Sequence, residues 1–150
     1  MIEKIIKGIK YRLDEENLTA EVIQKKGYEG DIIIPEAVVL KEVAYCVTSI
    51  GKGAFIWCDS LTSIVIPDGV MSIGLEAFSG CSSLTSMVIP DGVTSIGKWA
   101  FRHCSSLTSI TFNGTKAQWN RIKLGDNWKG NWKLRIAAQR VHCTDGKVKI

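Results

Sequence analysis

The sequence predicts an α/β, β-rich solenoid with a β-hairpin cap at each end, in which short coils of chain stack on one another. A pattern of apolar residues recurs with a period of 23 in the middle of the 150-residue chain. The first 46 residues and the last 36 lack this pattern, and both contain alternating segments typical of hairpins. A fixed period of about 20–50 residues indicates a repeat array, here with its end pieces as one structural domain.

Two interpretations are open for residues 1–10. The isoleucines at positions 2, 5, 6 and 9 fit one face of a helix with lysines on the other, which would suit a basic amphipathic membrane anchor. Two helical turns are short for an anchor, and the segment leads directly into alternating sequence. We therefore expect a terminal strand or a docked turn.

The rest of the N-terminal cap, placed at residues 1–46, has strand patterns. Apolar residues alternate with polar ones from Tyr11 to Val22, with Leu18 among them, on both sides of the polar segment 14–17. This alternation predicts a β-hairpin. Residues 31–35 form a short apolar run that Pro35 ends, and an extended segment at 43–47 leads into the first coil. A cap is needed because the first coil would otherwise expose its apolar cross-section.

Three repeats follow at residues 47–114, and each passes from Val-x-Ser-Ile-Gly through Ala-Phe and Cys to Leu-Thr-Ser. The sequence Leu84-x-x-Met87-x-Ile89 is a strand signature of leucine-rich repeats. Residues 93–97 begin the next coil with a second short strand, and the Ala-Phe-x-x-Cys segment has room for one helical or 3₁₀ turn. The expected core positions are Phe55, Phe78, Phe101, Cys58, Cys81, Cys104, Leu61, Leu84 and Leu107.

The C-terminal cap is placed at residues 115–150. Residues 116–133 carry Trp119, Trp128 and Trp132 among basic and glycine residues, which indicates a short helix and a loop that cover the open end. Residues 134–142 and 147–150 flank Thr144-Asp145-Gly146, which predicts a second hairpin.

The repeat pattern resembles that of the BspA-like leucine-rich repeat family. Residues 58–78 match C-x-x-L-x-x-I-x-I-P-x-x-V-x-x-I-G-x-x-A-F, the pattern recurs at 81–101, and segments 113–119 and 141–146 are similar to the family's C-terminal cap. The resemblance implies a right-handed solenoid, adhesion to host or bacterial proteins, and a secreted or surface location. It supplies no catalytic residues.

Charge and cysteine content bear on partners and compartment. The net charge is +4, and the last 39 residues alone hold +7. No apolar run is long enough to span a membrane, and no secretory signal is evident at the N-terminus. Five cysteines cannot all pair within one chain, so we expect free thiols and a reducing, cytoplasmic compartment. The family resemblance implies the alternative, a surface or secreted protein.

Catalysis, a cofactor and a metal site are not expected. The chain has only two histidines, and we identify no constellation for nucleophilic or general-base catalysis around either. Cysteines at the repeat period could line up as a metal site, but nothing nearby offers a fourth ligand, so a buried structural role is favoured. The basic, Trp-containing segment 116–140 leaves single-stranded nucleic-acid binding as an alternative to simple end-sealing.

The positions at which the repeats disagree indicate where a partner could bind. The scaffold positions are constant, whereas the turn after each Ile-Gly varies in charge and size. Tryptophan and arginine are favoured at binding hot spots. The candidate partner-binding residues are Trp57, Leu75, Trp99, Arg102 and His103.

These observations predict a non-catalytic module that recognises a protein or a glycan. The alternative is a structural role without an external ligand, in which exposed solenoid edges join copies of the chain into a homo-oligomer.

Overall fold

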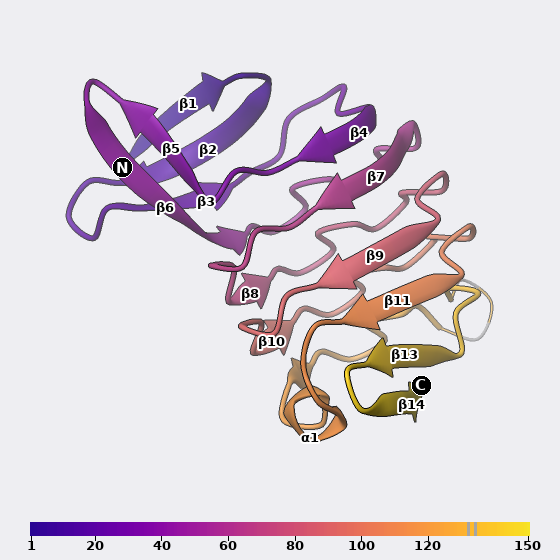
Figure 1. The fold of residues 1–150 in the computed structure, drawn as a ribbon. Coiled ribbons are helices and arrows are strands. Elements are labelled where there is room, and N and C mark those ends of the chain that lie inside the picture. Colours follow the sequence, from indigo (N-terminus) through magenta and orange to yellow (C-terminus); the bar gives the residue numbers. More distant parts are fainter. Residues whose placement is uncertain (132, 134) are drawn as a thin grey trace.

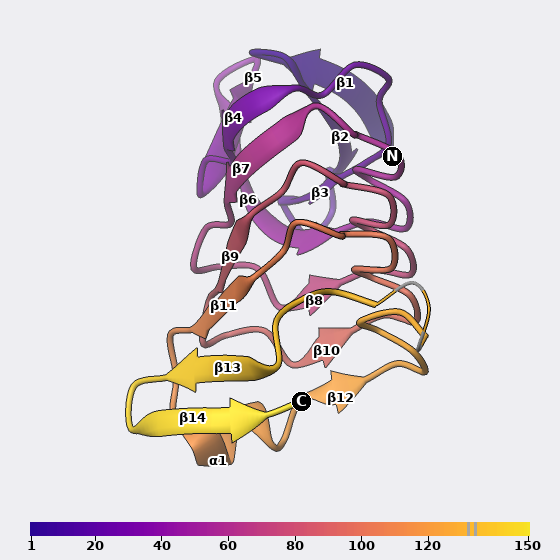
Figure 2. The same ribbon diagram turned by 90° about the vertical axis from the view of Figure 1, so that its right-hand side faces the viewer.

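In the computed structural model, the chain winds into a capped solenoid whose two walls of short strands face each other across one core (Figures 1 and 2). The structure describes residues 1–131, 133 and 135–150. The predicted β-rich solenoid is confirmed, and helix is limited to one short element in this part of the chain. The expectations for Trp132 and Leu134 lie outside the described residues.

The elements have the following bounds. The N-terminal strands are β1 (Ile2–Ile6), β2 (Ile9–Asp14), β3 (Thr19–Val22), β4 (Gly30–Ile33), β5 (Ala37–Leu40) and β6 (Val43–Ile50). The central strands are β7 (Leu61–Val65), β8 (Ser72–Ile73), β9 (Ser86–Ile89), β10 (Ser95–Ile96) and β11 (Ser109–Phe112). The C-terminal elements are α1 (Lys116–Trp119), β12 (Lys123–Leu124), β13 (Arg140–Cys143) and β14 (Gly146–Lys149).

One wall is a sheet in the order β1-β2-β3-β6-β8-β10-β12, with β5 paired to β6. Its cap strands β1, β2 and β3 are antiparallel, whereas β3, β6, β8, β10 and β12 run parallel because each coil contributes one strand in the same direction. The other wall contains the parallel pair β4-β7 and the sheet β9-β11-β13-β14. In Figure 1 these strands follow one another down one side of the molecule.

The N-terminal cap agrees with the expectation at its first strand and differs from it in two other places. Residues 2–6 form strand β1, so the helical anchor is excluded and the prediction of a terminal strand is confirmed. Leu18 does not belong to the hairpin's buried side, because it lies in the turn with φ 54° and is exposed. Strand β5 was not expected, and it forms a hairpin with β6, which runs on through residue 50 into the first coil.

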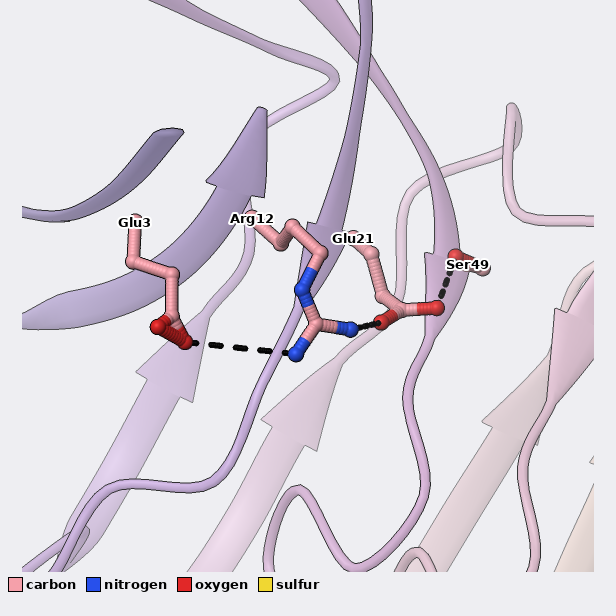
Figure 3. Close-up of polar contacts among 4 residues, drawn as sticks. All are labelled: Glu3, Arg12, Glu21 and Ser49. Carbon is pink, nitrogen blue, oxygen red and sulfur yellow. Dashed lines mark hydrogen bonds and ion pairs between the residues drawn. The ribbon is translucent and has the colours of Figure 1, made fainter. Parts of the chain in front are cut away.

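A row of polar side chains crosses the outer face of the cap (Figure 3). Arg12 lies between Glu3 at 3.9 Å and Glu21 at 3.0 Å, and the Ser49 hydroxyl donates to Glu21 at 3.3 Å. These four residues are register partners across β1, β2, β3 and β6. The same row continues through the coils as Ser72, Ser95 and Lys123.

The Ala-Phe-x-x-Cys segments, expected to form one helical or 3₁₀ turn, form consecutive turns closed by hydrogen bonds of the 3₁₀ type and no regular helix. In the first coil the amides of residues 54, 56 and 58 donate three residues back, at 3.1–3.2 Å. The alternate amides of residues 53, 55 and 57 donate to carbonyls of residues 75, 77 and 79 in the next coil, at 2.7–2.9 Å. A helix cannot form because every second amide is used between coils.

The coils approach one another closely at a column of glycines. A Cβ atom on Gly97 would lie 2.4 Å from the Leu75 backbone nitrogen, and one on Gly74 would lie 2.8 Å from the Gly51 carbonyl carbon. Any side chain at these positions would push the coils apart. The constant Gly of the Ile-Gly pair is therefore explained by close backbone approach.

The expected core residues line the interior. Phe55, Phe78 and Phe101 stack with parallel rings and centroid separations of 5.2 and 5.4 Å. The nine residues expected in the core are all buried. At about 1.5–3 kcal/mol for each large apolar side chain, this column and its neighbours supply most of the stability.

Aromatic side chains close the C-terminal end. Helix α1 begins at Thr115 with a capping box formed with Gln118. Trp119 and Trp128 are buried, and Trp128 meets Phe101 edge to face at 6.1 Å. The hairpin β13-β14 is confirmed, although its first strand begins at Arg140, six residues later than expected.

Phe78→Ala should lower the free energy of unfolding by about 3–5 kcal/mol, because it removes the middle ring of the stack and leaves a cavity. Val88→Ala, at an exposed position of β9, should cost less than about 1 kcal/mol. Urea unfolding of both variants measures the difference. Equal losses would contradict the assignment of Phe78 to the core.

Candidate functional site

The candidate partner-binding residues lie on one side of the solenoid, which we call the turn edge: residues 51–58, 74–81 and 97–104. Inter-coil hydrogen bonds fix its backbone, as in Phe78 N–H to Ala100 O at 2.8 Å and Phe101 N–H to Trp128 O at 2.8 Å. Side chains at the turn edge therefore project from a rigid support, a property that favours recognition by surface complementarity.

Two positions in every coil of the turn edge have a left-handed backbone. At the first position the φ values are 60° for Gly53, 54° for Glu76 and 57° for Trp99. At the second position they are 56° for Trp57, 83° for Gly80 and 64° for His103. Glycine suits this conformation, whereas a residue with a Cβ atom is strained in it by about 1–2 kcal/mol. Bulky residues nevertheless occupy four of these six positions.

Trp57 and His103 form an aromatic surface that spans three coils. Trp57 is 60% exposed, and its ring centroid lies 5.3 Å from that of His103. Gly80 lies in the coil between them, where a Cβ atom would be 2.3 Å from Trp57 Cε3. Glycine at residue 80 thus provides both the left-handed turn and the space over which the indole lies.

Trp99 and Arg102 form the second cluster of the turn edge. The Lys98 Nζ lies 4.3 Å from the centroid of the Trp99 ring, and the Arg102 guanidinium lies 4.4 Å from it. Arg102 also reaches Glu76 in the preceding coil, at 3.8 Å. Its buried Nε finds no hydrogen-bond partner in the part of the chain that the structure describes. The arginine is consequently held by ring stacking and a single ion pair.

Leu75 completes the candidate set and is half-buried between Lys52 and Lys98, its equivalents in the neighbouring coils. Two pockets adjoin the turn edge, and Trp57 contributes to both. One pocket, of about 320 Å³, lies toward the cap residues 24–29, and the other, of about 340 Å³, includes Asp59, Ser82 and His103. The shape of this part of the surface therefore depends on the Trp57 side chain.

The repeated cysteines are part of the scaffold. The Cys81 thiol donates to the Phe55 carbonyl at 3.1 Å, and the Cys104 thiol donates to the Phe78 carbonyl at 3.0 Å. Each thiol therefore links its coil to the preceding one. Burial raises the pKa of Cys58 from 9.0 to about 11. A hydrogen bond with Cys104, together with burial, raises the pKa of Cys81 further. Raised pKa values disfavour the reactive thiolate.

Nucleic-acid binding by base stacking is not supported by Trp119 and Trp128, the two tryptophans of segment 116–140 that the structure describes. Trp119 and Trp128 are buried and pack on each other at 5.8 Å between ring centroids, so neither can stack on a base. Among the described residues no group of three or more His, Cys, Asp or Glu side chains is placed to hold a metal ion. Within the same residues no helix is long and apolar enough to cross a bilayer.

The left-handed turn positions were not recognised in the sequence. Gly53 stands where the other coils have Glu76 and Trp99, and Gly80 stands where they have Trp57 and His103. The signal available was the glycine at these two positions, which indicates a backbone with positive φ.

Comparisons with known proteins place this geometry in context. A family model described as the BspA type leucine rich repeat region matches residues 43–122 with six copies, which is more than half of the chain. A crystal structure of a leucine-rich repeat protein from Bacteroides capillosus is 24% identical, with a TM-score of 0.75, over 94% of this chain and 97% of that one. Another, from Bacteroides ovatus, is 28% identical with a TM-score of 0.73, over 93% of this chain and 37% of that one. The comparison with curated proteins gave no match.

Trp57→Gly should be more stable than Trp57→Ala by about 1 kcal/mol, because glycine relieves the strain of a positive φ. At Lys52, where φ is not positive, glycine should be the less stable of the two by about 0.5–1 kcal/mol. Thermal and urea unfolding of the four variants test this reversal. If alanine is the better residue at both positions, the left-handed turn is wrong.

Stability should fall by about 1–3 kcal/mol between pH 9 and pH 11. The unfolded chain loses the Cys58 proton near pH 9, whereas the folded chain retains it to about pH 11. The unfolded state thus binds fewer protons in this window and is favoured as pH rises. Urea midpoints at pH 8, 9.5 and 11 measure the slope, and Cys58→Ala should make it shallower. An unchanged slope in that variant would assign the effect to other groups.

Proposed function

The chain belongs to the family of BspA-type leucine-rich repeat proteins, and from this premise we propose that it is a non-catalytic module that binds another protein through its turn edge. Proteins with such repeats typically mediate protein interaction and are generally not enzymes. The observation that carries the proposal is the presence of Trp57, Trp99 and His103 at backbone positions suited to glycine.

Local strain supports a functional role for these side chains. Residues held in sparsely populated backbone regions cost about 1–3 kcal/mol each and are concentrated at functional sites. The fold itself tolerates glycine at both positions, as Gly53 and Gly80 show. A tryptophan at an equivalent position therefore contributes something other than the turn.

The composition of the turn edge supports a protein partner. Tryptophan and arginine are the residues most often found at hot spots, where an exposed aromatic ring becomes buried on binding. Trp57 offers such a ring, and the Trp99–Arg102 stack offers a second anchor already ordered before binding. Ordering in advance reduces the entropy lost on association.

The alternative from the sequence, in which exposed solenoid edges join copies of the chain, stays a prediction. Stacking of copies end to end gains no support, because both ends of the array are covered. The β1-β2-β3 meander covers one end, and α1 with Trp119 and Trp128 covers the other.

The family membership also supports a place at the cell surface or outside the cell, where BspA-type repeats are common, over the cytoplasm that the free thiols suggested.

The proposal can be tested with peptides selected from a random phage-displayed library on the purified protein. Peptides that bind should lose about 30-fold in affinity on the double variant Trp57→Gly/Trp99→Gly, which corresponds to a hot-spot loss of about 2 kcal/mol. Biolayer interferometry measures both. The control is Met71→Ala/Val88→Ala, which truncates two exposed apolar side chains outside the turn edge.

Peptides that bind the double glycine variant as tightly as the parent chain would contradict the turn-edge site. A glycan array on the same proteins distinguishes the second kind of ligand. Sugar binding lost in the glycine variant, with no peptide selected, would replace the protein partner by a glycan at the same site.

A further inference from the structure

A second surface lies on the wall opposite β8, β10 and β12, and we call it the strand face: the outward side chains of β4, β7, β9, β11, β13 and β14. Its first row passes through register partners Ile33 and Val65, then Val88 and Thr111, then His142 and Lys147. The second row passes through Asp31 and Ser63, then Ser86 and Ser109, then Arg140 and Lys149. The first row is therefore aliphatic at its N-terminal end, the second row is polar there, and both rows become basic on β13 and β14. Figure 1 shows the order of these strands along the solenoid.

Four basic residues share one side of the β13-β14 hairpin. Arg140 lies directly opposite Lys149, and His142 lies directly opposite Lys147. All four are exposed, whereas the alternate residues Val141 and Val148 pack toward the core. Opposite residues have Cβ atoms about 5 Å apart, and the two pairs are about 7 Å apart along the strands.

No ion pair among the described residues neutralises this cluster. Arg140, Lys147 and Lys149 make no ion pair in the part of the chain that the structure describes. Asp145, in the hairpin turn, accepts from the backbone amide of Lys116 at the start of α1. Like charges directly opposite each other destabilise an antiparallel pair. The sequence thus maintains an arrangement that weakens its own hairpin.

We propose that the cationic end of the strand face binds an anionic polysaccharide that carries sulfate or carboxylate groups. The arginine fork and the two lysines would bind the anionic groups by charge-assisted hydrogen bonds. Ser109 and Thr111, half-buried on the adjacent strand β11, place hydroxyls beside the cluster for the neutral hydroxyls of a sugar chain.

The character of the surface favours a polysaccharide over other polyanions. Single-stranded nucleic acid gains affinity by stacking bases on aromatic rings. The exposed Trp57 belongs to the turn edge, and the one aromatic ring in the cluster is the imidazole of His142. The strand face has hydroxyls and cations on a sheet, which suits a chain of sugars with spaced anionic groups. The site is separate from the proposed protein-binding site and does not depend on it.

The test uses heparin, a sulfated polysaccharide, with the full chain immobilised for surface plasmon resonance. Heparin should bind with an affinity that falls steeply as the salt concentration rises from 50 to 200 mM, because binding releases the counterions held by the polyanion. Lys147→Glu/Lys149→Glu should weaken binding at least about tenfold. Lys26→Glu/Lys41→Glu, with the same change in net charge on exposed cap residues, should bind as the parent chain does.

Two further measurements separate the site from general effects. Lys147→Glu/Lys149→Glu should unfold at an equal or higher urea concentration than the parent, because it places opposite charges across β13-β14. Trp57→Gly/Trp99→Gly should leave heparin binding unchanged. A folded Lys147→Glu/Lys149→Glu variant that binds heparin as tightly as the cap control overturns the proposal.

Competition identifies the ligand class. Neutral dextran should not displace heparin, and oligo(dT) and poly-glutamate should displace it only at concentrations at least about tenfold higher than heparin itself. If oligo(dT) competes as well as heparin, the cluster binds nucleic acid or any polyanion, and the polysaccharide assignment is wrong. If poly-glutamate competes equally, an acidic protein segment replaces the polysaccharide as the partner.

Discussion

The spacing between coils is the constraint on which the rest of the structure depends. In the first coil the amides of Gly53, Phe55 and Trp57 donate to the next coil at 2.7–2.9 Å, and the second coil repeats this pattern at 2.8–3.0 Å. At that spacing the phenylalanine rings stack in parallel at 5.2 and 5.4 Å. The same spacing leaves no room for a Cβ atom on Gly97. The hydrogen bonds between coils, the ring stacking and the close approach at the glycines therefore all depend on the same spacing between coils.

A backbone held in this way leaves the outward side chains free to differ between coils. The turn edge and the strand face use that freedom differently. At the turn edge, large side chains occupy strained positions of single coils, as Trp57 and His103 do on either side of Gly80. On the strand face, neighbouring strands contribute to rows, so Arg140 and Lys149 form a cluster that neither strand has alone. The turn edge offers separate aromatic anchors, and the strand face offers a cluster of basic side chains at one end.

Much of the fold could be predicted because the signal is periodic and local. The 23-residue period identified the coils, and alternation identified the hairpins at both ends. Strand β5 escaped notice because Ala37–Leu40 is uniformly apolar and its pairing with β6 is a tertiary choice. The turns at Trp57 and Trp99 were missed because their hydrogen bonds join residues in different coils, although Gly53 and Gly80 at the equivalent positions were a usable signal. The basic C-terminus was visible, but the opposition of Arg140 and Lys149 depends on the hairpin register, which is set by the turn and by the inward packing of Val141 and Val148.

The polar row that begins with Glu3, Arg12 and Glu21 changes character at Ser49. Beyond that point each coil presents a serine to a serine of the next, as Ser72 does to Ser95. A new coil inserted between these two would meet the same neighbours that the present coils meet, and neither cap would need a compensating change. Tandem duplication of a 23-residue unit is therefore a single genetic step that preserves the serine row and both caps, and the number of coils is open to evolution while the ends stay fixed.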